Sequence, residues 1–498
     1  MLNELARGIT EINQPKIERM LFAALVGIFF GIFVLIIFKL PVKFTYYLIG
    51  GPIILFIAIL TGRFKRFFQG LLIFILPIHS ATHFFRRYYE YGVGGLAFGD
   101  LDIILIVLYL IWIYELLIKK SGSFHFFPKI TIPALSLVGI SALSMIPAQD
   151  PYLALFETIH IFKAILLYFY VANHFRSKKD ISFVLILLLS GLFLQSLLAF
   201  AQRLLGLNLG LYIFGERELR SYYLTHGYYA DVVRPGATLG TTGKLAKYVV
   251  SLMPLSITLL FTNIRPRYKL ANSLVFTCAL IVLVLTMSRA GWIGFLGAMV
   301  LLFLLIFRVK LVSLRTLMTI GLVAIILIGV GMSFFALIES RLASEPPGEP
   351  IEERMVQNQR AIRIIKAHPL LGVGARNHGK VQHLFISLKR IPLFQLHNTY
   401  LIAAVETGIL GLLILLWLLS SIFLQGLRNL KTNHIFFVCL NIGILAGLFA
   451  RWIVWLPSPC WLGSGETIFW LLSGLVMASA KISEEERMLQ IEGEKTHR

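Results

Sequence analysis

A histidine lies at the point where an apolar segment of the chain begins. His397 and Asn398 open the stretch HNTYLIAAVETGILGLL, which follows a long polar segment. Histidine titrates close to neutral pH, so His397 is a candidate general base for a reaction that removes a proton from a hydroxyl group. The simpler interpretation is structural: Asn398 caps the amino end of a helix and His397 merely stands beside it. The stretch alone leaves both interpretations open.

Arginines in the same half of the chain have the chemistry needed to bind phosphate. Arg234 lies in RPGATLGTTGKLAKYVV, Arg289 in TMSRAGWIGF, and Arg354 in EERMVQNQRAIRIIKA. A guanidinium can bind two phosphate oxygens at once, so Arg289 and Arg354 are candidates for a diphosphate clamp. The alternatives are that Arg289 only reaches toward lipid headgroups and that Arg354 is a solvated charge beside a glutamate.

The elements that must position these residues have the composition of a membrane protein. Of 498 residues, 57% are hydrophobic and 14% are charged, and the mean hydropathy is +0.81. Apolar runs long enough to span a bilayer recur along the chain, and the pattern predicts an all-α polytopic membrane protein with about 12–14 transmembrane helices. A large periplasmic loop is expected to carry further helices. The first run, Leu21 to Phe38, is expected to be a span rather than a cleavable signal peptide.

The distribution of basic residues sets the expected orientation. Lysines and arginines cluster in alternate short connections, which by the positive-inside rule face the cytoplasm together with both termini. The long connections then face the periplasm. The predicted organisation is N-terminal transmembrane helices (1–203), a first long periplasmic loop (204–244), central transmembrane helices (245–337), a large periplasmic loop (338–396), C-terminal transmembrane helices (397–480) and a cytoplasmic tail (481–498).

Charge and cysteine content exclude other classes of protein. The formal net charge of +21 does not indicate nucleic-acid binding, because the basic residues form small clusters between apolar runs rather than one stripe. Cys278, Cys439 and Cys460 are widely separated, so they predict neither a disulfide framework nor a thiolate metal site. The amphipathic stretch HFFRRYYEYGVGG leaves the number of spans open, because it could lie in the membrane interface.

Acidic and basic residues inside the predicted helices have structural interpretations. Asp100 and Asp102 form a DxD pattern at the start of a span, which we interpret as a helix cap rather than a metal site. Glu157 and Lys163 are expected to reach the helix edge or to form interhelical ion pairs, with a proton or ion pathway as the alternative. Glu406 follows His397 in the same span and is expected to pack there.

Taken together, these motifs resemble the O-antigen ligase family, within the wider superfamily of O-antigen ligases and polymerases. The resemblance rests on TMSRAGW, AHPLLGVGARNHG and HNTYLIAAVETGILGLL in this order, and it runs from Arg234 to Leu413. It implies transfer of a glycan from undecaprenyl pyrophosphate to a second acceptor at the periplasmic face of the inner membrane, without a metal or another cofactor.

The resemblance also assigns residues. It makes His397 the motif histidine, Arg289 the arginine of the SR motif and Arg354 the arginine that opens the loop helix. Arg234 corresponds to an arginine that precedes a TFG-type turn, although TLGTTGKLA departs from the family pattern, in which a Pro-Asn pair is usual. The expected site residues are, as catalytic groups, His397, Arg289 and Arg354, and, as substrate-binding groups, Arg234, Asn398 and Asn377.

The expected reaction is a direct displacement that inverts the anomeric centre. His397 would take the proton of the acceptor hydroxyl while the arginines neutralise the departing diphosphate. The expected partners are an undecaprenyl-pyrophosphate-linked glycan donor, lipid A-core or another glycan acceptor, and membrane lipids, with no nucleic acid. The alternatives are an O-antigen or exopolysaccharide polymerase, a protein O-oligosaccharyltransferase and, from another class, a lipid or polysaccharide transporter or flippase. The large loop before the His-Asn motif favours the ligase.

Overall fold

The structure is a computed structural model that describes residues 42–78, 81–89, 92–121, 123–222, 232–311, 314–343, 349–385, 396–432, 434–460, 462–463 and 465–496. The predicted first span, Leu21 to Phe38, lies outside the described residues. The chain forms two compact units, Met1–Phe68 and Gln69–Arg498. All of the predicted site residues belong to the second unit.

Helices make up most of the described chain, which confirms the predicted all-α class. The first unit contains α2 (Val42–Leu60) and the start of α3 (Phe64–Phe74). The longer helices of the second unit are α4 (Asp100–Leu117), α5 (Pro128–Leu143), α6 (Pro151–His174), α7 (Lys178–Leu205), α8 (Thr242–Leu260), α9 (Pro266–Leu285), α10 (Arg289–Arg308), α11 (Leu314–Ser333), α13 (Glu349–Ala367), α15 (Thr399–Asn429), α16 (Ile435–Trp455) and α17 (Thr467–Thr496). Its short helices are η1 (Tyr212–Phe214), η2 (Ala237–Leu239), α12 (Phe335–Ala343), α14 (His378–Val381) and η3 (Gln382–Phe385).

Within the described residues, 7 helices are long and apolar enough to cross a membrane: α6, α7, α8, α9, α10, α15 and α16. Shorter apolar helical segments are Gly50–Leu60, Pro128–Leu143, Leu317–Ser333 and Thr467–Ile482. Helices of this length and composition identify the chain as a polytopic membrane protein, as predicted.

Glycines bring α8, α10 and α16 into backbone contact in the interior of the second unit. A Cβ atom on Gly447 of α16 would lie 2.1 Å from the carbonyl oxygen of Ser251 in α8. A Cβ atom on Gly294 of α10 would lie 2.8 Å from the carbonyl oxygen of Ala450. Membrane helices pack closely where small residues allow it, so these glycines fix the position of α16 between its two neighbours.

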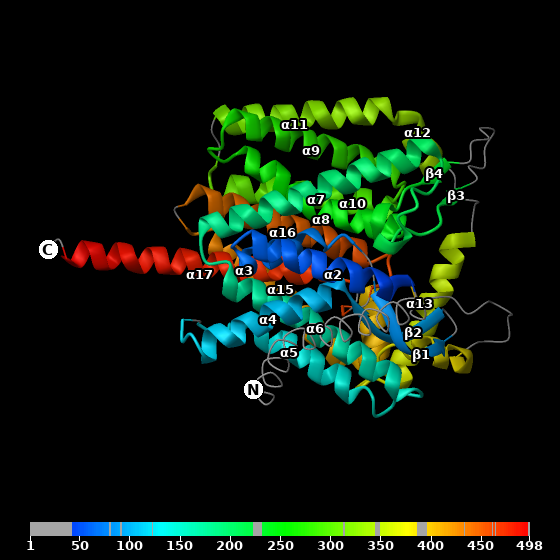
Figure 1. Ribbon diagram of the computed structural model, residues 1–498. Helices are drawn as coiled ribbons and strands as arrows, with labels where there is room; N and C mark the ends of the chain where they lie inside the picture. Colours follow the sequence, from blue (N-terminus) through cyan, green and yellow to red (C-terminus); the bar gives the residue numbers. More distant parts are fainter. Residues whose placement is uncertain are drawn as a thin grey trace, which may run out of the picture. The chain divides into compact units, whose positions relative to one another are not determined.

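Glycine contacts give the relative direction of α6 and α17. α6 and α17 run in the same direction, because Gly463 packs against His160 and Gly474 against Val171. Figure 1 shows α13, the hairpin of β1 (Ala81–Tyr89) and β2 (Gly92–Gly99), and the pair β3 (Arg220–Tyr222) and β4 (Val232–Arg234) at the same end of these helices. We call this end of the second unit the loop end.

The described residues of the stretch HFFRRYYEYGVGG lie in two paired strands. β1 and β2 pair in antiparallel register from Ala81 with Gly99 to Tyr89 with Gly92. A Cβ atom on Gly95 would lie 2.7 Å from the carbonyl oxygen of Phe84, so only glycine allows the strands to approach here. The strand-forming aromatic residues of β1 and the glycines of β2 explain this outcome, which amphipathicity alone did not indicate.

Candidate functional site

The helix that follows His397 is kinked, and a loop fills the kink. Gly408 in α15 has φ 73° and ψ −178°, which interrupts the helical hydrogen bonds. Val373 N–H donates to the Val405 carbonyl at 2.9 Å, and Ile409 N–H donates to the Pro369 carbonyl at 2.8 Å. The segment HPLLGVG therefore satisfies backbone groups that the kink would otherwise leave without partners.

This contact explains why glycines occur in both motifs. A Cβ atom on Gly408 would lie 2.0 Å from the Leu370 carbonyl oxygen, and one on Gly372 would lie 2.4 Å from the Val405 carbonyl oxygen. Gly372 also has φ +66°, a conformation that favours glycine. The motifs HPLLGVG and HNTYLIAAVETG are thus two sides of one backbone interface.

A small apolar core holds α13 against the first turns of α15. Its buried residues are Ala361, Ile364, Val373, Val381, Leu396, Ile402 and Val405. These side chains come from α13, from the loop that fills the kink and from both sides of the His-Asn motif. The core therefore fixes the large loop beside His397, and does so through contacts between segments that are distant in sequence.

His397 lies at the amino end of α15, next to α13. Its Nδ1 lies 3.3 Å from Oε1 of Gln357, which is a buried residue of α13. When Gln357 Oε1 accepts this hydrogen bond, Nδ1 carries the proton and Nε2 is the nitrogen that can take up another. Asn398 caps α15, because its Oδ1 accepts the backbone N–H groups of Tyr400 at 3.0 Å and Leu401 at 3.1 Å.

Arg354 lies on α13 one turn before Gln357. Residues three apart on a helix are neighbours, but Arg354 is exposed whereas Gln357 is buried. A contact between Arg354 and a ligand near His397 stays a prediction.

The structure brings Arg234 and Arg289 to the same turn. Arg234 Nε donates to the Thr286 carbonyl at 2.9 Å, and Nη2 lies 3.5 Å from the Met287 carbonyl oxygen. Met287 has φ 53°, an uncommon conformation for a residue with a side chain. Ser288 then caps α10 by accepting the Gly291 N–H at 3.2 Å. Arg234 thus stabilises, through hydrogen bonds, the turn that precedes Arg289 at the start of α10.

The turn with Arg289 and the start of α15 both lie at the carboxyl end of α16. Thr399 Oγ1 donates to the Ser458 carbonyl at 2.8 Å, and the Tyr400 hydroxyl donates to the Trp452 carbonyl at 3.1 Å. Gly294, just over one turn after Arg289, packs on Ala450 as described above. The structure therefore brings the helix starts that carry Arg289 and His397 to one end of one helix.

Asn377 anchors the large loop instead of facing a cavity. The side chain is fully buried, at 0% exposure. Its Oδ1 accepts the Asp150 N–H at 2.8 Å, and its Nδ2 donates to the carbonyls of Asp150 at 3.1 Å and Ala375 at 2.9 Å. These bonds attach the loop to the start of α6, and a direct contact of Asn377 with substrate stays a prediction.

An apolar groove runs beside the start of α15. It has a volume of about 560 Å³ and lies between α15 and α16. Tyr400 lines it near His397, and Trp452 lines it together with Phe423, whose ring centroid lies 6.2 Å from that of Trp452. Leu424 and Leu456 in its wall are half exposed, so the groove opens on the side of the helices. We call it the apolar groove.

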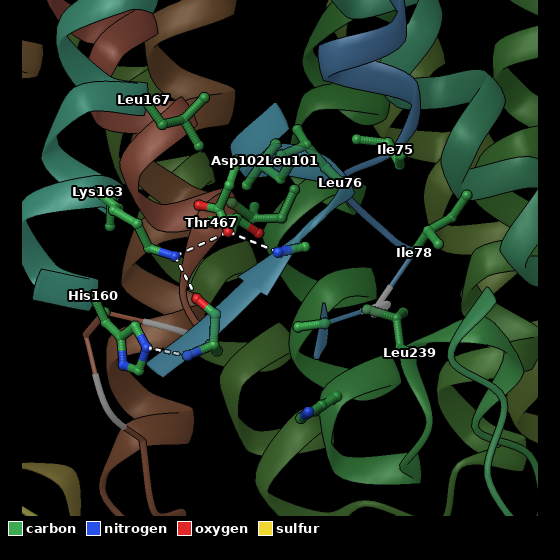
Figure 2. Close-up of a pocket in the computed structure, with 18 of the residues that line it drawn as sticks. Ile75, Leu76, Ile78, Leu101, Asp102, His160, Lys163, Leu167, Leu239 and Thr467 are labelled. Carbon is green, nitrogen blue, oxygen red and sulfur yellow. Dashed lines mark hydrogen bonds and ion pairs between the residues drawn. The ribbon is translucent and has the colours of Figure 1, made fainter. Parts of the chain in front are cut away.

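A second cavity, of about 130 Å³, lies between α4, α6, α8, α16 and the start of α17. Its basic lining residues are Lys163, Lys244, Lys247 and Arg451. In Figure 2, Lys163 and Asp102 face this cavity from one side, and apolar side chains form the opposite wall. We call it the basic cavity. The predicted site residues do not line it.

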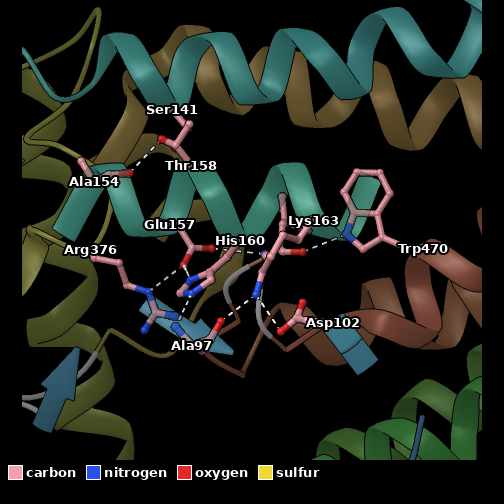
Figure 3. A network of polar contacts seen from close by, with 12 residues as sticks. Ala97, Asp102, Ser141, Ala154, Glu157, Thr158, His160, Lys163, Arg376 and Trp470 are labelled. Atoms are coloured by element: carbon pink, nitrogen blue, oxygen red, sulfur yellow. Dashed lines mark hydrogen bonds and ion pairs between the residues drawn. The ribbon is translucent and has the colours of Figure 1, made fainter. Parts of the chain in front are cut away.

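Charged side chains on α6 join the loop and the hairpin (Figure 3). Glu157 Oε2 pairs with Arg376 Nε at 2.9 Å and lies 3.5 Å from His160 Nδ1. His160 Nε2 accepts the N–H of Ala97 in β2 at 2.9 Å. Because Nε2 is the acceptor, the neutral ring carries its proton on Nδ1, toward the Glu157 carboxylate. Glu157 and His160 therefore attach α6 to the loop through Arg376 and to β2 through Ala97.

Lys163 continues this line of charges toward α4. Its Nζ donates to Asp102 Oδ2 at 2.9 Å and to the Ala97 carbonyl at 2.6 Å. Asp102 Oδ2 also accepts the Gly99 N–H at 2.8 Å, which confirms the predicted helix cap. Lys163 therefore forms the predicted kind of interhelical ion pair, with Asp102 of α4, whereas Glu157 pairs with Arg376 of the large loop. We call the set Glu157, His160, Lys163, Asp102 and Arg376 the α6 network.

Sequence analysis did not single out several charged or polar residues that matter here. Gln357 and Arg376 lie in segments that the sequence analysis quoted, but their partners lie 40 and 219 positions away in the sequence. Lys247 and Arg451 could have been found, because a cation inside an apolar run requires a partner or a ligand. Their position inside apolar runs was enough to predict that each needs an anionic partner or a ligand.

Comparison with known proteins agrees with the motifs. A family model described as O-antigen ligase matches residues 274–416. The matched segment starts in α9, ends in α15 and contains Arg289, Arg354 and His397. No curated protein matches the chain. The predicted resemblance to the O-antigen ligase family is confirmed over this segment, which supports a function within the superfamily of O-antigen ligases and polymerases.

Proposed function

We propose that this protein transfers a glycan from undecaprenyl pyrophosphate to lipid A-core at the periplasmic face of the inner membrane. The observation that carries the proposal is the meeting of two helix starts at the carboxyl end of α16. One start presents His397 beside Gln357 of α13, and the other begins with Arg289. The apolar groove runs beside the same helix end.

The proposed reaction is a single inverting displacement without a metal. The acceptor hydroxyl attacks C1 of the donor sugar, its proton moves to Nε2 of His397, and the bond from C1 to the diphosphate oxygen breaks. The hydrogen bond from Nδ1 to Gln357 keeps the ring in the tautomer that can accept this proton. The departing diphosphate carries the negative charge that Arg289 and Arg354 would neutralise.

The apolar groove suits the lipid part of the donor. It is lined by leucine, isoleucine and aromatic side chains and reaches from Tyr400 along α15 and α16. A polyprenyl chain lying there would place the attached diphosphate at the helix end, three positions before Tyr400, where His397 lies. The burial of apolar surface would then supply much of the donor's affinity.

The distribution of basic residues supports an orientation in the membrane with the loop end facing the periplasm. Lys178 and Lys179 begin α7, and Arg308 ends α10, at the opposite end from the loop end. By the positive-inside rule that opposite end faces the cytoplasm, which leaves the loop end in the periplasm.

The test is a reconstituted transfer reaction. The purified full chain in liposomes receives an undecaprenyl-pyrophosphate-linked glycan and lipid A-core, with a chelator present. We expect glycan on lipid A-core at a rate that the chelator does not change. Growth of the lipid-linked glycan with bare lipid A-core would instead identify a polymerase. The absence of either product, with the donor intact, would overturn the proposal.

A further inference from the structure

The basic cavity carries more positive charge than its surroundings balance. Lys163 pairs with Asp102 at 2.9 Å, and Arg451 forms a hydrogen-bonded ion pair with Glu466. Lys247 lies 3.6 Å from the same Glu466 carboxylate. Lys163, Lys247 and Arg451 thus share two carboxylates.

Lys244 adds a further cation. Among the described residues its ammonium group has no hydrogen-bond or ion-pair partner, and it lies near Lys247 and Arg217. Within the described part of the chain, four cationic side chains line the cavity and two carboxylates pair with them, which leaves two positive charges without a counter-charge there. Enclosed charges of this kind are costly unless an anion joins them.

Cys460 does not supply the missing negative charge. Its Sγ lies 3.4 Å from Lys247 Nζ and donates a hydrogen bond to Glu466. Burial, together with the adjacent Glu466, raises the pKa of the Cys460 thiol to about 12, so the thiol is neutral. Burial would raise the pKa of Glu466, but the Arg451 and Lys247 cations outweigh it and hold this pKa below its ordinary value. Glu466 is therefore ionised, and it is one of the two carboxylates in the charge balance above.

Three helix starts also face the cavity. Leu101 and Asp102 belong to the first turn of α4, Lys244 to that of α8, and Thr467 and Ile468 to that of α17. The amino end of a helix attracts anions through its free N–H groups and its dipole. At α4 the aspartates already use this attraction, whereas the first turns of α8 and α17 carry no acidic residue.

We propose that the basic cavity binds the phosphate-bearing headgroup of a lipid-linked substrate, with Lys244 and Lys247 contacting the phosphoryl oxygens. A dianion matches the two unbalanced charges. A single water needs roughly 10–15 Å³ of space for its centre, so the cavity of about 130 Å³ admits a group of several atoms. The inference rests on the proposed function for the lipid nature of the substrate, and it assigns a site apart from Arg289, Arg354 and His397.

The location fits such a substrate. The cavity wall includes Gly463 and Gly465, in the connection between α16 and α17. The same connection carries Ser458, which accepts the hydrogen bond from Thr399 at the start of α15. A headgroup in the basic cavity would therefore lie at the same end of α16 as His397. The diphosphate of the donor and a phosphate on the acceptor lipid share this chemistry, and a donor held here would move to Arg289 and Arg354 for the transfer itself.

The experiment measures equilibrium binding of radiolabelled inorganic pyrophosphate to the purified full chain in a phosphate-free detergent. We expect saturable binding that Lys244→Gln weakens about tenfold or more, as expected for loss of a charge-assisted hydrogen bond. Lys244→Arg should retain binding. Lys129→Gln, which removes an exposed lysine from the first turn of α5, is the matched control and should bind like the wild type.

Lys244→Gln should fold, because it removes a cation that has no partner among the described residues. Equal binding by Lys244→Gln and the wild type, or no saturable binding by either, would overturn the proposal. Displacement of pyrophosphate by undecaprenyl pyrophosphate identifies the donor as the ligand, and displacement by lipid A identifies the acceptor. Displacement by neither lipid would refute the assignment to a substrate headgroup. A chain that binds pyrophosphate through Lys244 yet transfers no glycan would refute the proposed function and leave the site standing.

Discussion

The start of α15 and the middle of α6 each hold a histidine beside an oxygen acceptor, but in different surroundings. His397 is partly exposed, at a helix end, and its Nδ1 lies 3.3 Å from the neutral amide oxygen of Gln357. His160 is 4% exposed and lies between the Glu157 carboxylate and the Ala97 N–H. A histidine enclosed by structural partners holds segments together, whereas one at a solvent-facing helix start beside a neutral partner is suited to proton transfer.

The comparison assigns different measurable roles to the two regions. Changes in the α6 network should alter stability, and changes around His397 and Arg289 should alter the rate of transfer by the folded protein. If changes in the α6 network slowed transfer without loss of stability, or changes at His397 and Arg289 mainly unfolded the protein, these two roles would be wrong.

The largest expected loss of stability comes from Arg376→Leu. The change leaves the Glu157 carboxylate, which is 3% exposed, with His160 but without its cation. Breaking a buried ion pair by removing one partner costs about 3–5 kcal/mol. The measurement is the free energy of unfolding in detergent.

The matched control for Arg376→Leu is Arg87→Leu. Arg87 is 43% exposed and lies 3.5 Å from Asp150, which keeps a second cation, Lys380, at 3.6 Å. Removing a solvent-exposed partner of this kind costs about 0–1 kcal/mol. If both variants lose the same small amount of stability, the α6 network does not have the structural role assigned to it.

Arg289→Ala should slow transfer with little change in stability. Removal of one preorganised group that stabilises developing charge typically costs about 10²- to 10³-fold in rate. Arg289→Lys should recover only part of the rate, because an ammonium cannot make the planar two-point contact with phosphate. The rates of glycan transfer are compared under single-turnover conditions. If Arg289→Lys transfers the glycan at the wild-type rate, a positive charge alone is enough at this position.

Asn398→Ala should have the smallest effect. The variant loses the side-chain oxygen that accepts the Tyr400 and Leu401 N–H groups. Loss of a helix cap costs about 0.5–2 kcal/mol. Asn398→Ser should retain most of the stability, since serine also caps helices well. A drop in transfer for both variants at unchanged stability would instead support the predicted role of Asn398 in substrate binding.

The sequence predicted those parts of the molecule that depend on local pattern. Apolar runs give helices, so the all-α membrane class follows from composition and periodicity. The motifs TMSRAGW and HNTYLIAAVETG predicted helices that begin near Arg289 and just after His397, and α10 and α15 begin there. Asn398 was recognised as a cap because capping depends on neighbouring backbone groups alone.

The features that the sequence did not predict depend on contacts between distant segments. The kink at Gly408 is matched by Leu370 and Gly372 in the loop, and neither segment reveals its partner. The pairing of Arg376 with Glu157 crosses more than two hundred positions. Side-chain charge shows that a partner is required, but only the packing of the helices decides which residue supplies it.

The central claim is that His397 takes the proton of the acceptor hydroxyl, and the most direct measurement compares wild type with His397→Ala in single-turnover transfer to lipid A-core. Donor affinity and the free energy of unfolding are measured on the same samples. We predict a rate lower by about 10²- to 10⁴-fold with donor affinity and stability unchanged. Transfer by His397→Ala at the wild-type rate would contradict the account.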